Sequence, residues 1–143
     1  MIVLDTNVLS ALMRRQPDPV VVAWLDRQPS ESVWTTAITV FEIQFGLELL
    51  AAGRRRHQLE EAFRCALAED LENRILSFDD QAAREAASRA AQRQAGGKVV
   101  DFRDVEIAGI VAARRATLAT RNLRHFRDLG IALVDPWTEM AIF

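Results

Sequence analysis

The amino-acid sequence predicts an α/β fold, a three-layer α/β/α sandwich around a central, mostly parallel sheet of about five strands. The first observation is the run Ile2–Leu4, which is apolar throughout and therefore typical of a strand buried on both faces of a parallel sheet. The second is that strand-like runs alternate with helical patterns, as in βαβ units. The third is a length of 143 residues without a linker or repeat, which predicts one domain over residues 1–143.

Hydrophobic periodicity divides the chain into five strands and seven helical segments. The expected strands lie at residues 2–4, 32–35, 74–78, 116–120 and 131–134. The expected helical segments lie at residues 6–13, 20–25, 39–49, about 59–67, 80–94, 102–115 and 123–129.

Prolines, a glycine and a capping threonine set the boundaries of the first four helices. Pro17 and Pro19 separate the first two, because proline cannot continue a helix. Thr39 is expected to cap the third helix. Gly53 and the three arginines that follow it are expected to separate the third helix from the fourth.

The later helices have clearer boundary signals. Asp79 or Asp80 is expected to cap the fifth helix, Gly96–Gly97 to end it, and Asp101 to cap the next. The fifth helix is rich in alanine, which predicts a close approach to a neighbouring backbone rather than a ligand site. The alanines are Ala82, Ala83, Ala86, Ala87, Ala90 and Ala91.

The formal net charge of −2 excludes a broad basic surface as the means of holding nucleic acid. Any polyanion must therefore bind at local clusters. These clusters are Arg54, Arg55 and Arg56, Arg114 and Arg115, and Arg121, Arg124 and Arg127. Lys98 is the single lysine.

The lone Cys65 excludes an internal disulfide and favours the reducing cytoplasm. No segment predicts a membrane span or a signal peptide, so no membrane partner is expected.

Three carboxylates lie where burial is expected. Asp5 ends the first strand, and ligands of open α/β sheets bind beyond the carboxyl ends of the strands. Glu42 lies three residues before Phe45, on or beside the apolar face of its helix. Asp104 heads an apolar stripe that continues with Ile107. An unpaired buried charge costs several kcal/mol, so each carboxylate needs a cationic partner.

Each acid also has a purely structural explanation. Asp5 is a candidate helix cap, Glu42 a rim residue turned to solvent, and Asp104 a first-turn residue that stabilises the helix dipole. Three carboxylates without an evident basic partner nevertheless favour a shared cation, because their repulsion otherwise raises their pKa values. Oxygen ligands favour Mg²⁺ or Mn²⁺, which orient a water for attack on a phosphodiester. Other polar residues expected at this mouth are Thr6, Thr120 and Asn122.

Four motifs are distributed along the chain. They are Met1-Ile2-Val3-Leu4-Asp5-Thr6-Asn7, the central Glu42, Asp104-x-x-Ile107-Ala108, and Thr120-Arg121-Asn122-x-x-His125-Phe126. Together they resemble the motifs of a PIN domain, and in particular those of the VapC-type ribonuclease toxins of bacterial type II toxin–antitoxin pairs. The resemblance covers essentially the whole chain and keeps the family's order and spacing. It implies a PIN-like form of the predicted sandwich and a metal-dependent endoribonuclease.

The resemblance also implies roles for individual residues. Asp5, Glu42 and Asp104 become the catalytic residues and the ligands of a divalent metal ion, Mg²⁺ or Mn²⁺. Many family members have a fourth acid where this chain has Asn122, which leaves the number of ions open. Residues expected to contact the substrate or to support the acids are Thr6, Asn7, Thr120, Arg121 and Asn122. The implied partners are an RNA substrate, a second copy in a homodimer, and a VapB-type antitoxin that covers the groove in a hetero-oligomer.

Other interpretations stay open at this point. His125 invites an acid–base role, but its place on a short helix beside Phe126 favours local packing. A phosphohydrolase of the haloacid dehalogenase type would use Asp5 as a nucleophile. It would also need an acid at position 7, which is Asn7, and a well-placed lysine, whereas Lys98 lies in a glycine-flanked loop. A catalytically weak PIN scaffold that binds RNA or protein without cleaving is disfavoured by the three retained acids.

Overall fold

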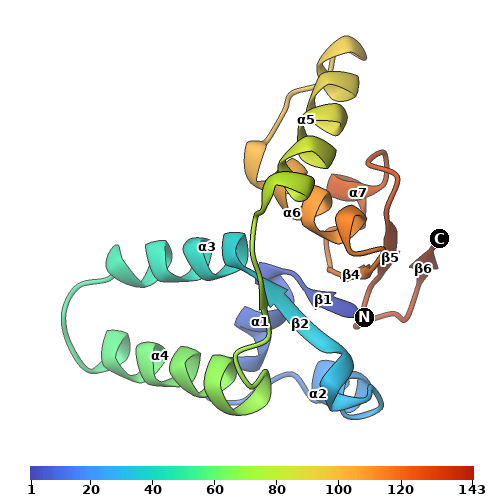
Figure 1. Ribbon diagram of the computed structural model, residues 1–143. Helices are drawn as coiled ribbons and strands as arrows, with labels where there is room; N and C mark the ends of the chain where they lie inside the picture. The colour runs from blue at the N-terminus through green and yellow to red at the C-terminus, as the bar shows by residue number, and fades with distance from the viewer.

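The computed structural model describes all 143 residues, and its elements follow the predicted order (Figure 1). The strands are β1 (Ile2–Leu4), β2 (Val33–Thr36), β3 (Ile75–Leu76), β4 (Thr117–Ala119), β5 (Ala132–Val134) and β6 (Ala141–Ile142). The α-helices are α1 (Thr6–Leu12), α2 (Pro19–Asp26), α3 (Ala37–Glu48), α4 (Arg54–Cys65), α5 (Asp80–Ala95), α6 (Phe102–Ala113) and α7 (Leu123–Phe126). A 3₁₀ turn (Ser30–Ser32) precedes β2, and a π-helical turn (Ala66–Asp70) continues α4.

The six strands form one sheet in the order β3-β2-β1-β4-β5-β6. The central β1 pairs in parallel with β2, where Ile2 faces Val33, and with β4, where Leu4 faces Ala119. Only β6 runs antiparallel to its neighbour. The carboxyl ends of β1, β2 and β4 therefore meet at one edge, and the predicted mostly parallel sheet is confirmed.

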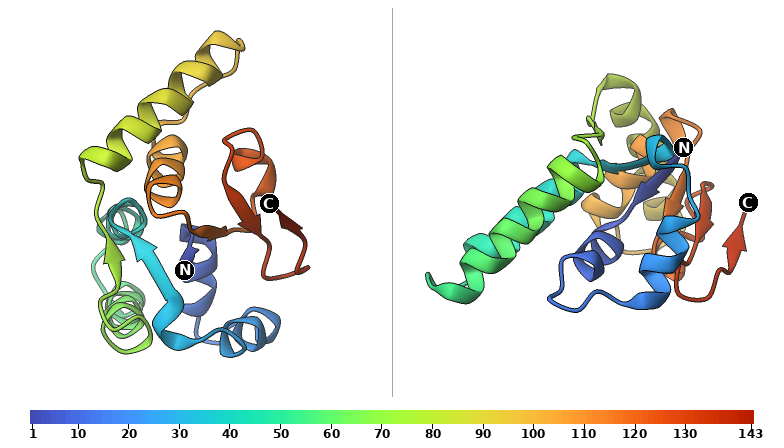
Figure 2. Two further views of the ribbon diagram at one scale, coloured as in Figure 1. Left: turned by 45° about the vertical axis from the view of Figure 1, so that its right-hand side comes forward. Right: turned by 90° about the horizontal axis from the view of Figure 1, so that it is seen from below.

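Helices cover both faces of this sheet, so the molecule has the three predicted layers (Figures 1 and 2). Successive residues of a strand point to opposite faces. Accordingly, Val3 packs in a core with α5, α6 and α7, whereas Leu4 packs in a second core with α1, α2, α3 and α4. None of the helices is both long and apolar enough to pass through a membrane.

Two of the three predicted helix caps are correct. Asp79 caps α5 and Asp101 caps α6, each through its side chain. The prediction that Thr39 caps α3 is wrong. The helix begins at Ala37, because the Thr36 hydroxyl accepts a hydrogen bond from the N–H of Thr39 at 3.0 Å.

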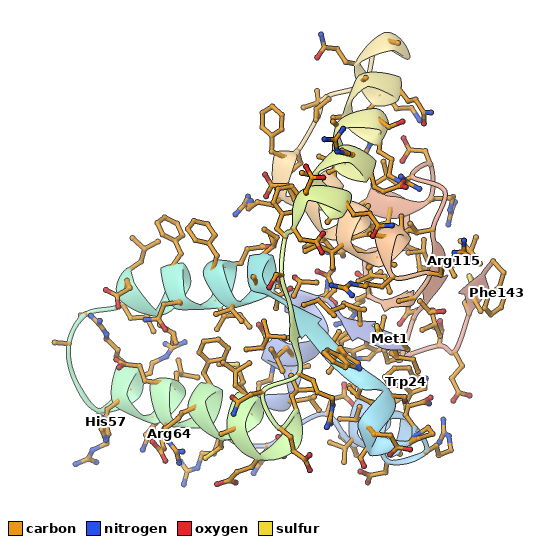
Figure 3. All side chains as sticks on the ribbon, in the orientation of Figure 1. Met1, Trp24, His57, Arg64, Arg115 and Phe143 are labelled. Carbon is orange, nitrogen blue, oxygen red and sulfur yellow. The ribbon has the colours of Figure 1, made fainter.

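The arginines after Gly53 belong to α4 and do not separate it from α3, as the sequence had suggested. Arg54 is the first residue of the helix. Arg56 lies 2.8 Å from Glu60 one turn later, and it also donates to the carbonyl of Leu50. Arg56 also lies 3.5 Å from Glu48, the last residue of α3. The contacts with Leu50 and Glu48 hold the start of α4 against the end of α3, and the two helices run side by side (Figures 1 and 2). His57 and Arg64 of α4 point away from α3 (Figure 3).

The strands differ from prediction mainly at the sheet edges. β3 has only two residues where five were expected, and β6 was not predicted at all. A two-residue edge strand is too short to show a periodicity of its own. The hydrogen bonds that define β6 come from its antiparallel neighbour β5.

The alanine-rich α5 packs closely on α6, as predicted (Figure 2). Gly109 of α6 lies at the point of contact. A Cβ atom at this position would stand 2.4 Å from the carbonyl oxygen of Ala82 and 2.7 Å from the Cβ of Ala86. The absence of a side chain at Gly109 is therefore what lets α6 lie this close to α5.

We expect Gly109→Ala to destabilise the protein by about 1–3 kcal/mol, the usual range for overpacking. This loss should appear although alanine is the better helix former by roughly 1 kcal/mol. Gly46→Ala is the matched control, since Gly46 also lies inside a helix but its added Cβ would meet nothing within 4 Å. Urea denaturation gives both values, and an unchanged or higher stability of Gly109→Ala would contradict the packing argument.

Candidate active site

A cleft of about 300 Å³ opens at the carboxyl edge of the sheet. The three predicted carboxylates line it, and each comes from a different element. Asp5 follows β1, Glu42 lies in the middle of α3, and Asp104 lies in the first turn of α6. The remaining lining residues are Thr6, Asn7, Asp101, Arg103, Asn122, His125 and Phe126. The fold therefore brings together acids that are 37 and 62 residues apart in the chain, as predicted.

Asp5 is held rigidly at the base of the cleft. Its side chain is buried, and it accepts hydrogen bonds from the N–H of Thr6 at 2.8 Å, the hydroxyl of Thr120 at 2.8 Å and the amide of Asn7 at 3.3 Å. Burial raises the pKa of Asp5 above its usual value, and the bonds from Thr120 and Thr6 oppose the rise. Asp5 is also the N-cap of α1, so the structural explanation of this residue is confirmed, and it is compatible with a place in the cleft.

Further hydrogen bonds of Asn7 and Thr120 tie the ends of β1 and β4 together. The hydroxyl oxygen of Thr120 accepts from the amide of Asn7 at 3.3 Å and from the N–H of Asn122 at 3.0 Å. The side-chain oxygen of Asn7 accepts from the N–H of Arg121 at 3.0 Å. Asn7 and Thr120 thus support the carboxylate of Asp5, which is the role expected of them.

Two further predicted residues take part in different ways. The hydroxyl of Thr6 lies 3.2 Å from that of Thr39, which joins α1 to α3 below the cleft. The guanidinium of Arg121 stacks over the ring of Trp137 at 4.7 Å, so only the main chain of Arg121 reaches the site. A third, Asn122, lines the cleft.

Glu42 is half-buried at the rim and has one cationic neighbour. Its side chain is 22% exposed, and its Oε2 lies 4.0 Å from Nη1 of Arg103. Burial and then the charge of Asp5 raise the pKa of Glu42, whereas Arg103 opposes the rise. Arg103 also lies 3.7 Å from Asp101 and is half-exposed, so it screens Glu42 only in part.

Asp104, the third acid of the cleft, also has a raised pKa. Burial and then the charge of Asp101 raise the pKa of Asp104 to about 6. Nδ1 of His125 lies 3.7 Å from Oδ2 of Asp104. The expectation that His125 packs locally is wrong, because its imidazole is half-exposed and faces this acid, whereas its neighbour Phe126 is buried in the core.

A divalent metal fits the chemistry of these donors. The three carboxylates share one cleft, each has a raised pKa, and Asp5 and Asp104 each raise the pKa of Glu42 through their charge. Hard oxygen donors of this kind favour Mg²⁺ or Mn²⁺. In this conformation no group of three acidic, histidine or cysteine side chains could hold a metal ion, so closure of the site requires side-chain movement. Glu42 is suited to such movement, since its side chain is partly exposed and its only ion pair is the long contact with Arg103.

The sequence interpretation missed Asp101 and Arg103 as site residues. Asp101 was predicted only as a helix cap, and it fulfils that role by accepting from the N–H of Arg103 at 3.0 Å. Because it precedes the first turn of α6, its carboxylate also reaches the cleft that Asp104 enters. The signal was available in the spacing, since a cap and an acid three residues later lie on the same side of a helix start.

Comparison with known proteins agrees with this geometry. Residues 2–132 match the PIN domain family. The chain is 39% identical over 137 residues to VapC ribonuclease Y4jK of Sinorhizobium fredii, covering 96% of this chain and 98% of that protein. It is 36% identical to Toxin FitB of Neisseria gonorrhoeae, with 96% and 99% covered.

Solved structures give the same result. The crystal structure of FitAcB from Neisseria gonorrhoeae has a TM-score of 0.85 at 36% identity and covers 96% of this chain and 99% of its own. DNA-bound VapBC from Salmonella typhimurium has a TM-score of 0.78 at 27% identity, with 94% and 97% covered. The chain therefore belongs to the PIN-domain family, among its VapC-type toxins.

Proposed function

We propose that this protein is a metal-dependent endoribonuclease that acts as the toxin of a toxin–antitoxin pair. The observation that carries the proposal is the convergence of Asp5, Glu42 and Asp104 on one cleft without a cation that neutralises them. Relatives named as a ribonuclease and as a tRNA(fMet)-specific endonuclease support it.

In the proposed mechanism, Asp5, Glu42 and Asp104 would hold a Mg²⁺ or Mn²⁺ ion, which would supply an activated water and charge stabilisation at the attacked phosphate. Thr120, Thr6 and Asn7 keep the carboxylate of Asp5 in one orientation. A residue held in this way enters the reaction without reorganising.

Asn122 occupies the place of a fourth acid and contributes a neutral amide. A neutral group at this position leaves the cleft less negative, which eases the approach of a phosphate. Its N–H is held by Thr120, so the residue has a defined place on the wall.

The alternative phosphohydrolase mechanism is poorly supported. That mechanism needs an acid at position 7, where this chain has Asn7, whose amide donates to the carboxylate of Asp5 at 3.3 Å and cannot act as a general acid. Lys98 lies outside this cleft and pairs with Asp128 at 3.1 Å. A scaffold that binds RNA without cleaving it is distinguished by the cleavage assay below.

We also propose an antitoxin partner of the VapB type, which would cover the cleft and form a hetero-oligomer with this chain. Several solved relatives are structures of such pairs, including FitAB and VapBC, some of them with DNA.

A second copy of this chain is proposed as a further partner. Phe41 and Phe45 stack at 5.9 Å on the outer side of α3 and, with Leu49, are more than half exposed. Burying this apolar surface between two copies would stabilise a symmetric dimer.

The first prediction tests the chemistry. Asp5→Asn and Asp104→Asn should each lower RNA cleavage by more than ~100-fold, because even the outer partners of metal ligands typically contribute 10–100-fold. Chelation should abolish wild-type cleavage, and Mg²⁺ or Mn²⁺ should restore it. Asp80→Asn, an exposed acid of α5, is the control and should cleave normally. Cleavage that persists in metal-free protein with excess chelator would rule out the proposed mechanism.

The second prediction concerns stability and pH in metal-free protein. With a pKa raised to about 6, Asp104 binds its proton more tightly in the folded state than in the unfolded state. Its contribution to stability therefore improves as the pH falls through about 6, and Asp104→Asn should remove that contribution. At pH 8 the variant should be more stable than the wild type by up to ~3 kcal/mol, at about 1.4 kcal/mol per pKa unit. Denaturation with chelator at pH 8 and below pH 4 tests this, and an equal difference at both values contradicts it.

The third prediction concerns assembly. Phe41→Ser combined with Phe45→Ser should convert a dimer to a monomer, because the pair forms the centre of the exposed apolar surface on α3. Phe143→Ser is the control, since this residue is 95% exposed at the chain end. Light scattering at ~10 µM, where a stable interface stays closed, distinguishes the two states. A monomeric wild type would show that α3 faces another partner.

A further inference from the structure

A second cleft of about 410 Å³ adjoins the active-site cleft and shares three of its residues, Asp101, Asp104 and His125. The imidazole of His125 stands 3.7 Å from Asp104 on this common wall. A molecule that fills both clefts therefore passes His125 without leaving the protein surface.

The two clefts differ in charge. The first holds four carboxylates and a single arginine, Arg103. Beyond the shared wall, the second adds three cations, Arg93, Lys98 and Arg124, against one further acid, Asp128. Positive charge is thus concentrated directly beside the acidic site, in a protein whose net charge is −2.

Arg93 and Lys98 are held in place by a network of hydrogen bonds and ion pairs. Arg93 is buried and donates to both carboxylate oxygens of Asp128, at 2.9 and 3.2 Å, and to the carbonyl of His125. Lys98 is mostly exposed, pairs with Asp128 at 3.1 Å, and donates its N–H to the carbonyl of Arg93 at 3.0 Å. The positive φ of Gly97 turns the chain at this point.

Arg124 completes the cleft and makes no ion pair or side-chain hydrogen bond. Arg93 and Lys98 both contact Asp128, so Arg124 is the cation of this cleft without an acidic partner. Lys98 has three N–H donors, of which Asp128 accepts one. Lys98 and Arg124 are exposed, whereas Arg93 is enclosed and holds the network. The pKa of Asp128 is lowered by the hydrogen bond from Arg93, which keeps this acid ionised and the network intact.

We propose that the second cleft binds a phosphate of single-stranded RNA adjacent to the phosphate that is cleaved, with Lys98 and Arg124 as the donors. This inference rests on the proposed function and names the path of its substrate. The exposed imidazole of His125, between the clefts, offers a flat surface on which the intervening base can stack. An acidic peptide would match the second cleft but would be repelled by the carboxylates of the first, whereas a phosphodiester strand continues into a metal-binding site.

The test compares two double variants of the full chain. Lys98→Gln/Arg124→Gln removes both donors. Arg64→Gln/Arg84→Gln removes the same charge from exposed arginines of α4 and α5 that pair only within their own helices. A fluorescent ten-nucleotide single-stranded RNA is titrated at several salt concentrations in chelator, so that binding is measured without cleavage.

Loss of the contacts to this one phosphate should make the slope of log affinity against log salt less steep by about 0.7, the value per phosphate for single strands. In the cleavage assay with Mg²⁺, KM should rise about tenfold or more while kcat is unchanged. The control should match the wild type in both assays. Lys98→Arg should keep the wild-type slope, because it retains the charge. If the double variant does not fold, Arg124→Gln alone replaces it, since this residue loses no partner.

An unchanged salt slope in Lys98→Gln/Arg124→Gln would overturn the proposal. Equal weakening of binding to a polyglutamate peptide of matched charge would also overturn it, because the cleft would then be a general anion surface. The binding assay does not depend on catalysis. A wild type that binds RNA through this cleft without cleaving it would refute the proposed function and leave the RNA path standing.

Discussion

The hydrogen bond from the Thr120 hydroxyl to the carboxylate of Asp5 is the contact on which the site depends. It joins the ends of two strands that are 115 residues apart in the chain, and it does so in the buried centre of the sheet. A carboxylate buried without partners would cost several kcal/mol. The donors from Thr120, Thr6 and Asn7 offset that penalty and fix the direction of Asp5. The parallel pairing of β1 with β4 places these donors, so the sheet and the site are stabilised together.

The second acid at the cleft depends on packing at a distance. Asp104 reaches the cleft because α6 lies close to α5, and that approach requires the bare backbone of Gly109 against Ala82 and Ala86. A wider separation would move the first turn of α6, together with Asp101 and Asp104. The alanine-rich α5 thus contributes no residue to the acidic cleft, yet its small side chains set the position of Asp101 and Asp104, which line it.

Charge is distributed unevenly around the cleft. The acids occupy the end of the sheet, where a metal would balance them, and Lys98 and Arg124 occupy the adjoining cleft. Arg121, next to the same motif, is directed instead to Trp137. The net charge of −2 therefore conceals local groups of cations, and Lys98 and Arg124 lie directly beside the acidic cleft. The expectation that any polyanion must bind through local clusters rather than a broad basic surface stays a prediction.

The sequence by itself determined the sandwich, the central place of β1 and the three acids of the cleft. The physical reason is that burial leaves a local trace: an unbroken apolar run predicts a strand covered on both faces, and a carboxylate on an apolar stripe predicts a shared partner. Only the tertiary structure decided the contacts between distant segments. Arg103 beside Glu42, His125 facing Asp104 and the strand β6 arise from elements that meet across the fold. Periodicity reports the environment along one element, whereas the distance between two elements is set by the packing of all the side chains between them.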